Sequence, residues 1–158
     1  MSRRKGRIYA FQALYSYDVG GVQLDELLKL EWTLKEDEEE EVKTDSYFEP
    51  SAEKKTVVSS DSADYARILI SGTINHLEEV DSMIKAHLSE KWDFNRLNKV
   101  SLAILRMSVY SLLYQKELPA SIVIDEAIDI ARKYGADDSF KFINAILDTV
   151  RKEIEAKA

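Results

Sequence analysis

The chain of 158 residues contains no cysteine. Disulfide bonds and thiolate metal sites are therefore excluded, which fits a reducing compartment. No apolar run reaches the ~20 residues of a membrane-spanning helix; the nearest candidate, Ser101 to Tyr114, is too short and contains Arg106. The N-terminus also lacks the apolar segment that follows the basic residues of a secretory signal. We therefore expect a cytoplasmic protein that does not enter a membrane.

Sequence motifs for catalysis are missing as well. The chain has no P-loop, no GxGxxG motif and no nucleophile elbow. Its two histidines, His76 and His87, stand eleven residues apart, too far to chelate one metal within a helix. The acidic pair Asp137-Asp138 falls at a predicted helix start, where the helix dipole accounts for it. We therefore predict no enzymatic activity, no metal and no cofactor.

Charge is distributed unevenly along the chain, whose net charge is −7. Residues 36–62 contain ten acidic side chains and three lysines, so this segment alone has a charge of −7 and the remainder is neutral. Residues 1–17 have four cationic side chains and no acid. Because polyanions respond to the local field, this basic arm is compatible with RNA binding despite the overall charge.

We interpret residues 1–158 as a single domain with an acidic insertion at residues 36–62. The insertion holds few large apolar groups and repels itself, which predicts a flexible loop. Two roles stay open for it: a passive spacer, or a segment that folds back on the basic arm and competes with RNA.

Apolar residues recur at helical spacing through the rest of the chain. A helix around Phe11 should stop at Gly20-Gly21, and the helix over Val100–Gln115, apolar on nearly every side, should be the central one. The other expected elements are a short helix at Leu24–Leu34, one stripe from Tyr65 to Leu88, a turn or short helix at Phe94–Leu97, a helix at Ala120–Tyr134 behind Pro119, and a last helix from Phe140 to Ile154.

Two positions in these helices need comment. Gly72 costs roughly 1 kcal/mol inside a helix, so we expect a close helix crossing there. Ser121–Ile124 alone could form a strand, but the stripe through Ala127 and Ile130 and the missing partner strands favour a helix. The predicted fold class is therefore all-α, with short connections apart from the insertion.

Two segments have side chains suited to single-stranded RNA. The last helix opens with Phe140-Lys141-Phe142, and Phe142 lies about 100° from the buried stripe, where a base can stack. Asp138 before it should cap this helix and, as an acid near phosphate, moderate RNA affinity. On the first helix, cationic, aromatic, amide and hydroxyl groups share one face: Lys5, Tyr9, Gln12 and Ser16. Tyr15 fits either the core or the surface.

Several separated motifs stand in order along the chain: Arg3-Arg4 with Gln12-Ala13-Leu14-Tyr15, Leu97 with Ala103-Ile104-Leu105-Arg106, Ile124-Asp125-Glu126-Ala127, and the longest, Tyr134-Gly135-Ala136-Asp137-Asp138-Ser139-Phe140-Lys141-Phe142-Ile143-Asn144. Together they resemble the NusB family. The resemblance covers the chain except for the acidic segment, which is longer than the family usually shows.

The resemblance implies a compact all-α bundle of about seven helices in two three-helix halves. It also implies a transcription antitermination factor that binds boxA-type single-stranded RNA in ribosomal RNA leaders. The implied partners are the small-subunit ribosomal protein NusE and, indirectly, the RNA polymerase elongation complex, whose premature termination is suppressed. The positions that match the family's RNA-facing region are Arg3, Arg4, Lys5, Arg7, Gln12, Tyr15, Asp138, Lys141 and Phe142.

Two other functions are compatible with parts of the sequence. The chain could be a protein–protein interaction scaffold without direct RNA contact, in which the arginines matter little. NusB-like domains also occur fused to RNA methyltransferases, but a chain that ends at Ala158 leaves no room for the enzyme domain. A homodimer stays open, since a helical module with an exposed partner patch can self-associate.

Overall fold

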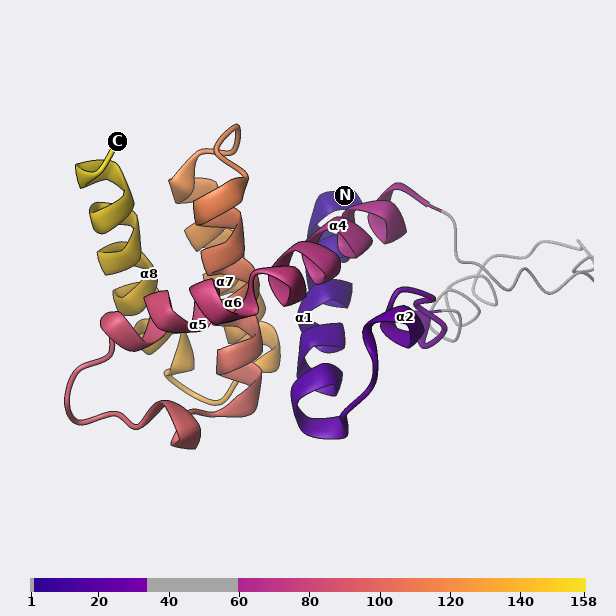
Figure 1. Cartoon of the computed structure of the whole chain (residues 1–158), viewed down its shortest axis with the longest axis horizontal. Coiled ribbons are helices and arrows are strands. Elements are labelled where there is room, and N and C mark those ends of the chain that lie inside the picture. The colour runs from indigo at the N-terminus through magenta and orange to yellow at the C-terminus, as the bar shows by residue number, and fades with distance from the viewer. Residues whose placement is uncertain (1, 34–59) are drawn as a thin grey trace, which may run out of the picture.

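The computed structural model describes residues 2–33 and 60–158, and every regular element in these ranges is helical (Figure 1). Seven α-helices and one 3₁₀ helix are present in the described ranges, which confirms the all-α prediction. They are α1 (Ser2–Gly20), α2 (Leu24–Leu27), α4 (Asp61–Asn75), α5 (Leu77–Ala86), the 3₁₀ helix η1 (Phe94–Arg96), α6 (Lys99–Tyr114), α7 (Ala120–Tyr134) and α8 (Ser139–Ala156).

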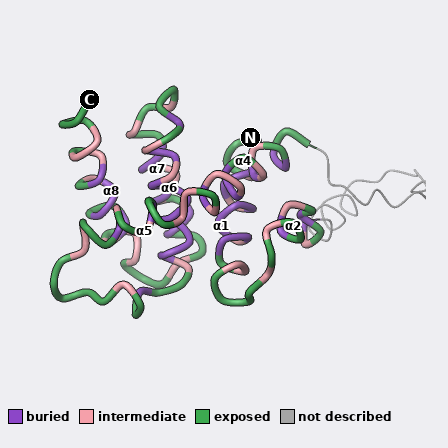
Figure 2. Tube along the Cα trace, in the orientation of Figure 1, coloured by how far each residue is buried: buried purple, intermediate pink, exposed green. Residues whose placement is uncertain are grey.

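The helices form two groups that meet along α6. The first group is α1, α2 and α4, and the second is α6, α7 and α8, with α5 connecting them. Figure 1 shows α1, α6, α7 and α8 roughly side by side, with α4 and α5 crossing in front of them. Residues 101–109 of α6 are all buried, so α6 is the central helix as predicted (Figure 2).

Local signals in the sequence account for the helix ends. Gly21 follows α1 with φ +64°, a left-handed conformation that glycine adopts at little cost. The side chain of Ser60 caps α4 by accepting a hydrogen bond from the Ala63 amide at 3.1 Å. Pro119 precedes α7, whose buried residues include Ala127 and Ile130, so Ser121–Ile124 is helical and the strand alternative is wrong.

Gly72 lies where α4 crosses α6. A Cβ atom built on Gly72 would stand 2.6 Å from Cε2 of Tyr110, and closer still to the end of that ring. Any larger residue would therefore push the ring of Tyr110 away. The close crossing that Gly72 predicted is confirmed, and it brings the two helical groups into contact.

Two boundary predictions were wrong. The stripe from Tyr65 to Leu88 is not one helix, because His76 (φ −115°, ψ 22°) separates α4 from α5. Its ring stacks on Tyr114 with centroids 4.2 Å apart, and the apolar residues on both sides of the break still face the core. Periodicity alone therefore could not reveal the break. The predicted end of the acidic insertion, Ser62, was also too late in the sequence, because Asp61 and Ser62 belong to α4. Residues 36–59 of the insertion lie outside the described residues.

Candidate nucleic-acid interface

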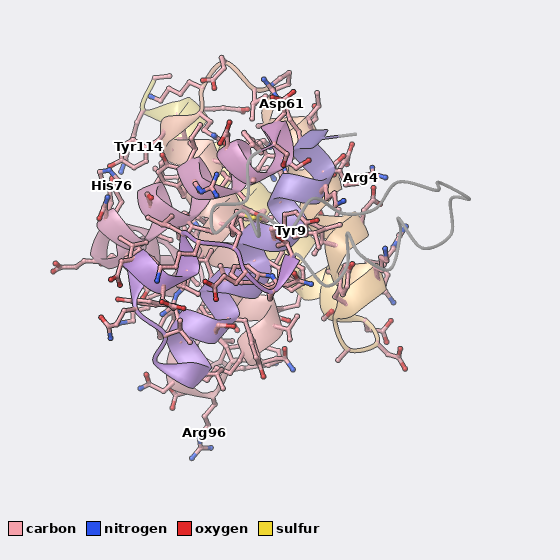
Figure 3. All side chains as sticks on the ribbon, turned by 90° about the vertical axis from the view of Figure 1, so that its right-hand side faces the viewer. Arg4, Tyr9, Asp61, His76, Arg96 and Tyr114 are labelled. Carbon is pink, nitrogen blue, oxygen red and sulfur yellow. The ribbon has the colours of Figure 1, made fainter. Side chains whose placement is uncertain are left out.

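The predicted basic arm occupies the first turns of α1, where its side chains differ in burial. Arg3 and Arg4 are exposed, Lys5 is half-buried, and Arg7 is buried at 7% exposure. Figure 3 shows Arg4 on the outside of the molecule, well away from Arg96 at the far end. The arm therefore presents two arginines to the surface.

Two acids on α7 hold Arg4 in place. Its Nε and Nη2 atoms donate to the two carboxylate oxygens of Glu126 at 3.1 and 3.0 Å, and Nη2 also donates to Asp129 at 3.3 Å. Donation of these hydrogen bonds to the Glu126 carboxylate raises the pKa of Arg4 above its ordinary value. Such bidentate pairs fix a guanidinium in orientation as well as charge. The start of α1 is therefore tied to the middle of α7.

Arg7 lies behind this surface. Its guanidinium stands 5.5 Å from the ring centroid of Tyr65 and within 4.0 Å of Glu126, while Arg3 approaches the same ring at 5.6 Å. The resemblance had assigned Arg7 to the RNA-facing region. In the structure it joins α1 to α4 and α7 from inside, because its side chain points toward the helix packing and not toward solvent.

The predicted line of side chains on α1 is interrupted by Tyr9. Tyr9 is only 3% exposed, so its ring belongs to the core, and the Nζ atom of Lys5 lies 5.7 Å from the ring centroid. The line therefore offers Lys5, Gln12 and Ser16 to a ligand, but not the ring that was expected between them.

A cavity of about 290 Å³ opens further along α1. Its lining comes from three helices, α1, α6 and α7, through Phe11, Gln12, Tyr15, Ser16, Val100 and Tyr134. Tyr15 is 37% exposed and Tyr134 38%, so both rings reach the surface. Phe11 and Tyr134 contact each other with ring centroids 5.2 Å apart. Aromatic rings around a polar amide and a hydroxyl suit a flat ligand with polar edges.

Gln12 is held from the side by Trp32. The indole Nε1 of Trp32 donates a hydrogen bond of 3.2 Å to Oε1 of Gln12. An indole nitrogen can only donate, so the amide must turn its carbonyl oxygen toward Trp32. The orientation of the Gln12 amide is therefore set by chemistry and not left to free rotation.

The turn between α7 and α8 differs from its prediction. Asp138 occupies the position before α8 but has φ +66° and makes no capping hydrogen bond with its side chain, so the predicted cap is wrong. The left-handed backbone does not turn this side chain toward the amides of the first turn. Its carboxylate instead lies 3.5 Å from Nζ of Lys141, which is 70% exposed. Asp138 therefore competes directly for the cation that was predicted to meet phosphate.

Phe142 lies at the margin of the core, as its position on the helix predicted. It is half-buried, and Trp92 packs against it with ring centroids 4.8 Å apart. The ring of Phe140, also half-buried, lies 4.5 Å beneath the guanidinium of Arg132. Phe142 is thus supported on one side and accessible in part.

The contact between Phe11 and Tyr134 brings the middle of α1 to the end of α7. Tyr15 is therefore close to the turn that leads to Lys141. Arg4 lies eleven residues before Tyr15, about 16 Å along the helix axis. The predicted residues form two groups, one at each end of this stretch of α1, with the cavity beside the second group.

Sequence reasoning missed several residues of this surface. They are Trp32, Trp92, Glu126, Asp129 and Tyr134. Tyr134 and Glu126 stand inside the motifs that carried the resemblance, so their position was a usable signal. Nothing in the local sequence of Trp32 indicates that its indole meets an amide twenty residues earlier.

The described part of the chain shows neither a metal-binding cluster nor a membrane-spanning helix. No group of three or more histidine, aspartate or glutamate side chains is arranged there to hold a metal ion. Among the helices described, none combines the length and apolar character needed to cross a membrane.

Comparison with known proteins gives a uniform result. A model of the NusB family matches residues 4–152. The transcription antitermination protein NusB of Treponema denticola is 42% identical over 153 residues, covering 97% of this chain and 98% of that protein. The protein of the same name from Geobacter sp. (strain M21) is 36% identical, with coverages of 99% and 98%.

Solved structures agree with this result. T. maritima NusB has a TM-score of 0.71 at 33% identity, covering 96% of this chain and 91% of that one. A crystal structure of the antitermination factors NusB and NusE in complex with double-stranded RNA has a TM-score of 0.74 at 27% identity, with coverages of 96% and 97%.

Proposed function

The chain belongs to the NusB family, and from this premise we propose that it is an RNA-binding transcription antitermination protein. It binds a boxA-type single-stranded element in ribosomal RNA leaders together with the ribosomal protein NusE. The complex joins the elongating RNA polymerase and suppresses premature termination. This role requires no catalysis and no cofactor, and it takes place in the cytoplasm, where bacteria transcribe.

The observation that carries the proposal is the surface along α1 and the α7–α8 turn. Exposed arginines at one end, a ring-lined cavity, and an exposed lysine beside a supported phenylalanine follow one another on it. Cations hold phosphates, while rings stack on bases that are free of a duplex. We assign RNA contact to Arg3, Arg4, Lys5, Gln12, Tyr15, Lys141 and Phe142, with Asp138 as a moderator and Arg7 as a support.

Partner and RNA binding are supported by the solved complex of a related NusB with NusE and RNA. The family model matches residues 4–152, a range that contains Arg4, Tyr15 and Lys141. The net charge of −7 does not oppose this proposal, because it comes from residues 36–62, while residues 1–17 carry four cationic side chains and no acid, and a polyanion responds to the local field.

The decisive experiment is a binding titration of the purified protein with a boxA RNA, with and without NusE, at several salt concentrations. For single-stranded RNA the log of affinity falls with log salt by about 0.7 for each phosphate neutralised. Lys141→Ala should make this slope shallower by about 0.7, and Arg3→Ala, at an exposed position, should have a similar effect.

Lys157, the residue that directly follows α8, provides a matched control. It is 73% exposed, against 70% for Lys141, but lies at the other end of α8. Lys157→Ala should therefore leave the slope unchanged. If no RNA binds even with NusE present, the proposal is wrong and the protein-interaction scaffold becomes the better description.

A further inference from the structure

The cavity beside α1 has the lining and the size to hold one planar aromatic ligand. Its walls carry the rings of Phe11, Tyr15 and Tyr134, and its polar groups are Gln12 and Ser16. At about 290 Å³ it falls at the lower end of small-molecule sites, which suits one planar ring system. Given the proposed function, on which this inference rests, the ligand at hand is a nucleobase of the bound RNA.

Trp32 decides which end of the Gln12 amide faces that base. Because the carbonyl oxygen accepts the indole hydrogen bond at 3.2 Å, the NH₂ group is the end that can meet a ligand. Without the indole, the amide could rotate and offer either an acceptor or a donor. The Trp32 bond occupies the carbonyl oxygen, so it favours the NH₂ group as the polar end of Gln12 available to a ligand in the cavity.

We propose that this cavity binds one nucleobase of single-stranded RNA and that Trp32, by orienting Gln12, makes it select keto bases over amino bases. Uracil and guanine present a carbonyl oxygen where cytosine and adenine present an NH₂ group. A donating amide pairs with the first and faces a second donor in the other. Trp32 is a positioning residue here, because it acts through Gln12.

The test compares two probes of equal length and charge, U₁₂ and C₁₂ oligoribonucleotides, at low salt. They differ at the exocyclic group that the amide would read, so their affinity ratio isolates base recognition from phosphate contact. The wild-type protein should bind U₁₂ roughly three- to tenfold more tightly, the range expected for one hydrogen bond gained against one left unmade. Trp32→Phe keeps a ring but removes the N–H group, and should bring the ratio close to one.

The chain contains one other tryptophan, Trp92, which packs on Phe142. Trp92→Phe makes Trp32 the sole tryptophan, whose emission should respond more to U₁₂ than to C₁₂. Gln12→Met provides a second route, and in the double variant with Trp32→Phe the ratio should fall no further than in either single variant.

The possible results of these measurements distinguish a failure of the base site from a failure of the proposed function. If U₁₂ and C₁₂ both bind with the expected salt dependence and Trp32→Phe leaves their ratio unchanged, the base site is wrong and the proposed function stands. If neither these probes nor a boxA RNA bind, with or without NusE, both are wrong. A loss of binding that tracks a lower melting temperature in Trp32→Phe is resolved by Gln12→Met, which must then abolish the preference.

Discussion

Replacing Gly72 by alanine tests the closest contact between the two helical groups. In an open helix this change stabilises by up to ~1 kcal/mol, because glycine is the poorer helix former. Here the new Cβ atom would stand 2.6 Å from Cε2 of Tyr110 and closer to its hydroxyl end, where ordinary contacts begin at 3.4 Å. The ring must move, since the α4 backbone cannot.

The cost follows from what the ring would lose. Tyr110 is half-buried and stacks against His76 and Tyr114, at 6.2 and 5.4 Å between centroids. An aromatic side chain buries about 150–250 Å². Losing roughly half of that at about 25 cal/mol per Å² costs about 2–3 kcal/mol. Subtracting the helix gain, we expect Gly72→Ala to lower the free energy of unfolding by about 1–2 kcal/mol, or the Tm by roughly 5 °C.

Urea and thermal unfolding measure this change, and a double-variant cycle identifies its cause. In a Tyr110→Ala background the obstruction is gone, so the same Gly72→Ala should raise stability. Gly20→Ala, whose Cβ would meet only Val22 at 3.6 Å, is the control and should be neutral or slightly stabilising. If Gly72→Ala destabilises equally with and without the ring of Tyr110, the crossing is not the reason.

Three further outcomes are expected. Asp138→Asn keeps a residue type that tolerates φ +66° but removes the negative charge beside Lys141. The variant should therefore bind RNA more tightly at an unchanged Tm. Equal or weaker binding at an unchanged Tm counts against a moderating role of Asp138. Asp81→Ala removes the bidentate partner of the buried Arg106, which keeps only the longer ion pair with Asp18 at 3.8 Å, so the free energy of unfolding in urea should fall by about 3 kcal/mol, the low end of the cost of breaking a buried pair. The hydrogen bond from His87 lowers the pKa of Glu153, so the ionised carboxylate stabilises the fold at pH values above the ordinary glutamate pKa. This stabilisation is lost as the pH falls through the lowered pKa. The Tm of Glu153→Gln should therefore fall less steeply toward acid pH than that of the wild type, and an identical pH profile would contradict this.

Much of the fold follows from local patterns in the sequence. Helical spacing located every long helix, and the apolar residues on nearly every side of Val100–Gln115 identified the central one. Gly21 and Pro119 marked helix ends because their backbone preferences act whatever surrounds them. The break at His76 escaped this reasoning, since one non-helical residue leaves the apolar period almost intact.

The candidate site was less accessible to sequence reasoning. Exposure at helix margins could be read from periodicity, and Phe142 lies where that reading put it. Burial of Arg7 and Tyr9 could not, because it depends on α4 and α7 packing over α1. The backbone of Asp138 also differed, since its left-handed conformation is imposed by a tight turn and not by residue type alone.

The amino-acid order by itself determined which segments are helical, where the positive charge gathers, and that thiol chemistry is excluded, because these depend on neighbours within a turn or two or on composition. Only the tertiary structure decided that Glu126 holds Arg4, that Trp32 orients Gln12, and that three helices line one open cavity. Each of these joins side chains twenty or more residues apart in sequence, or from three separate helices, and no local preference encodes such a meeting.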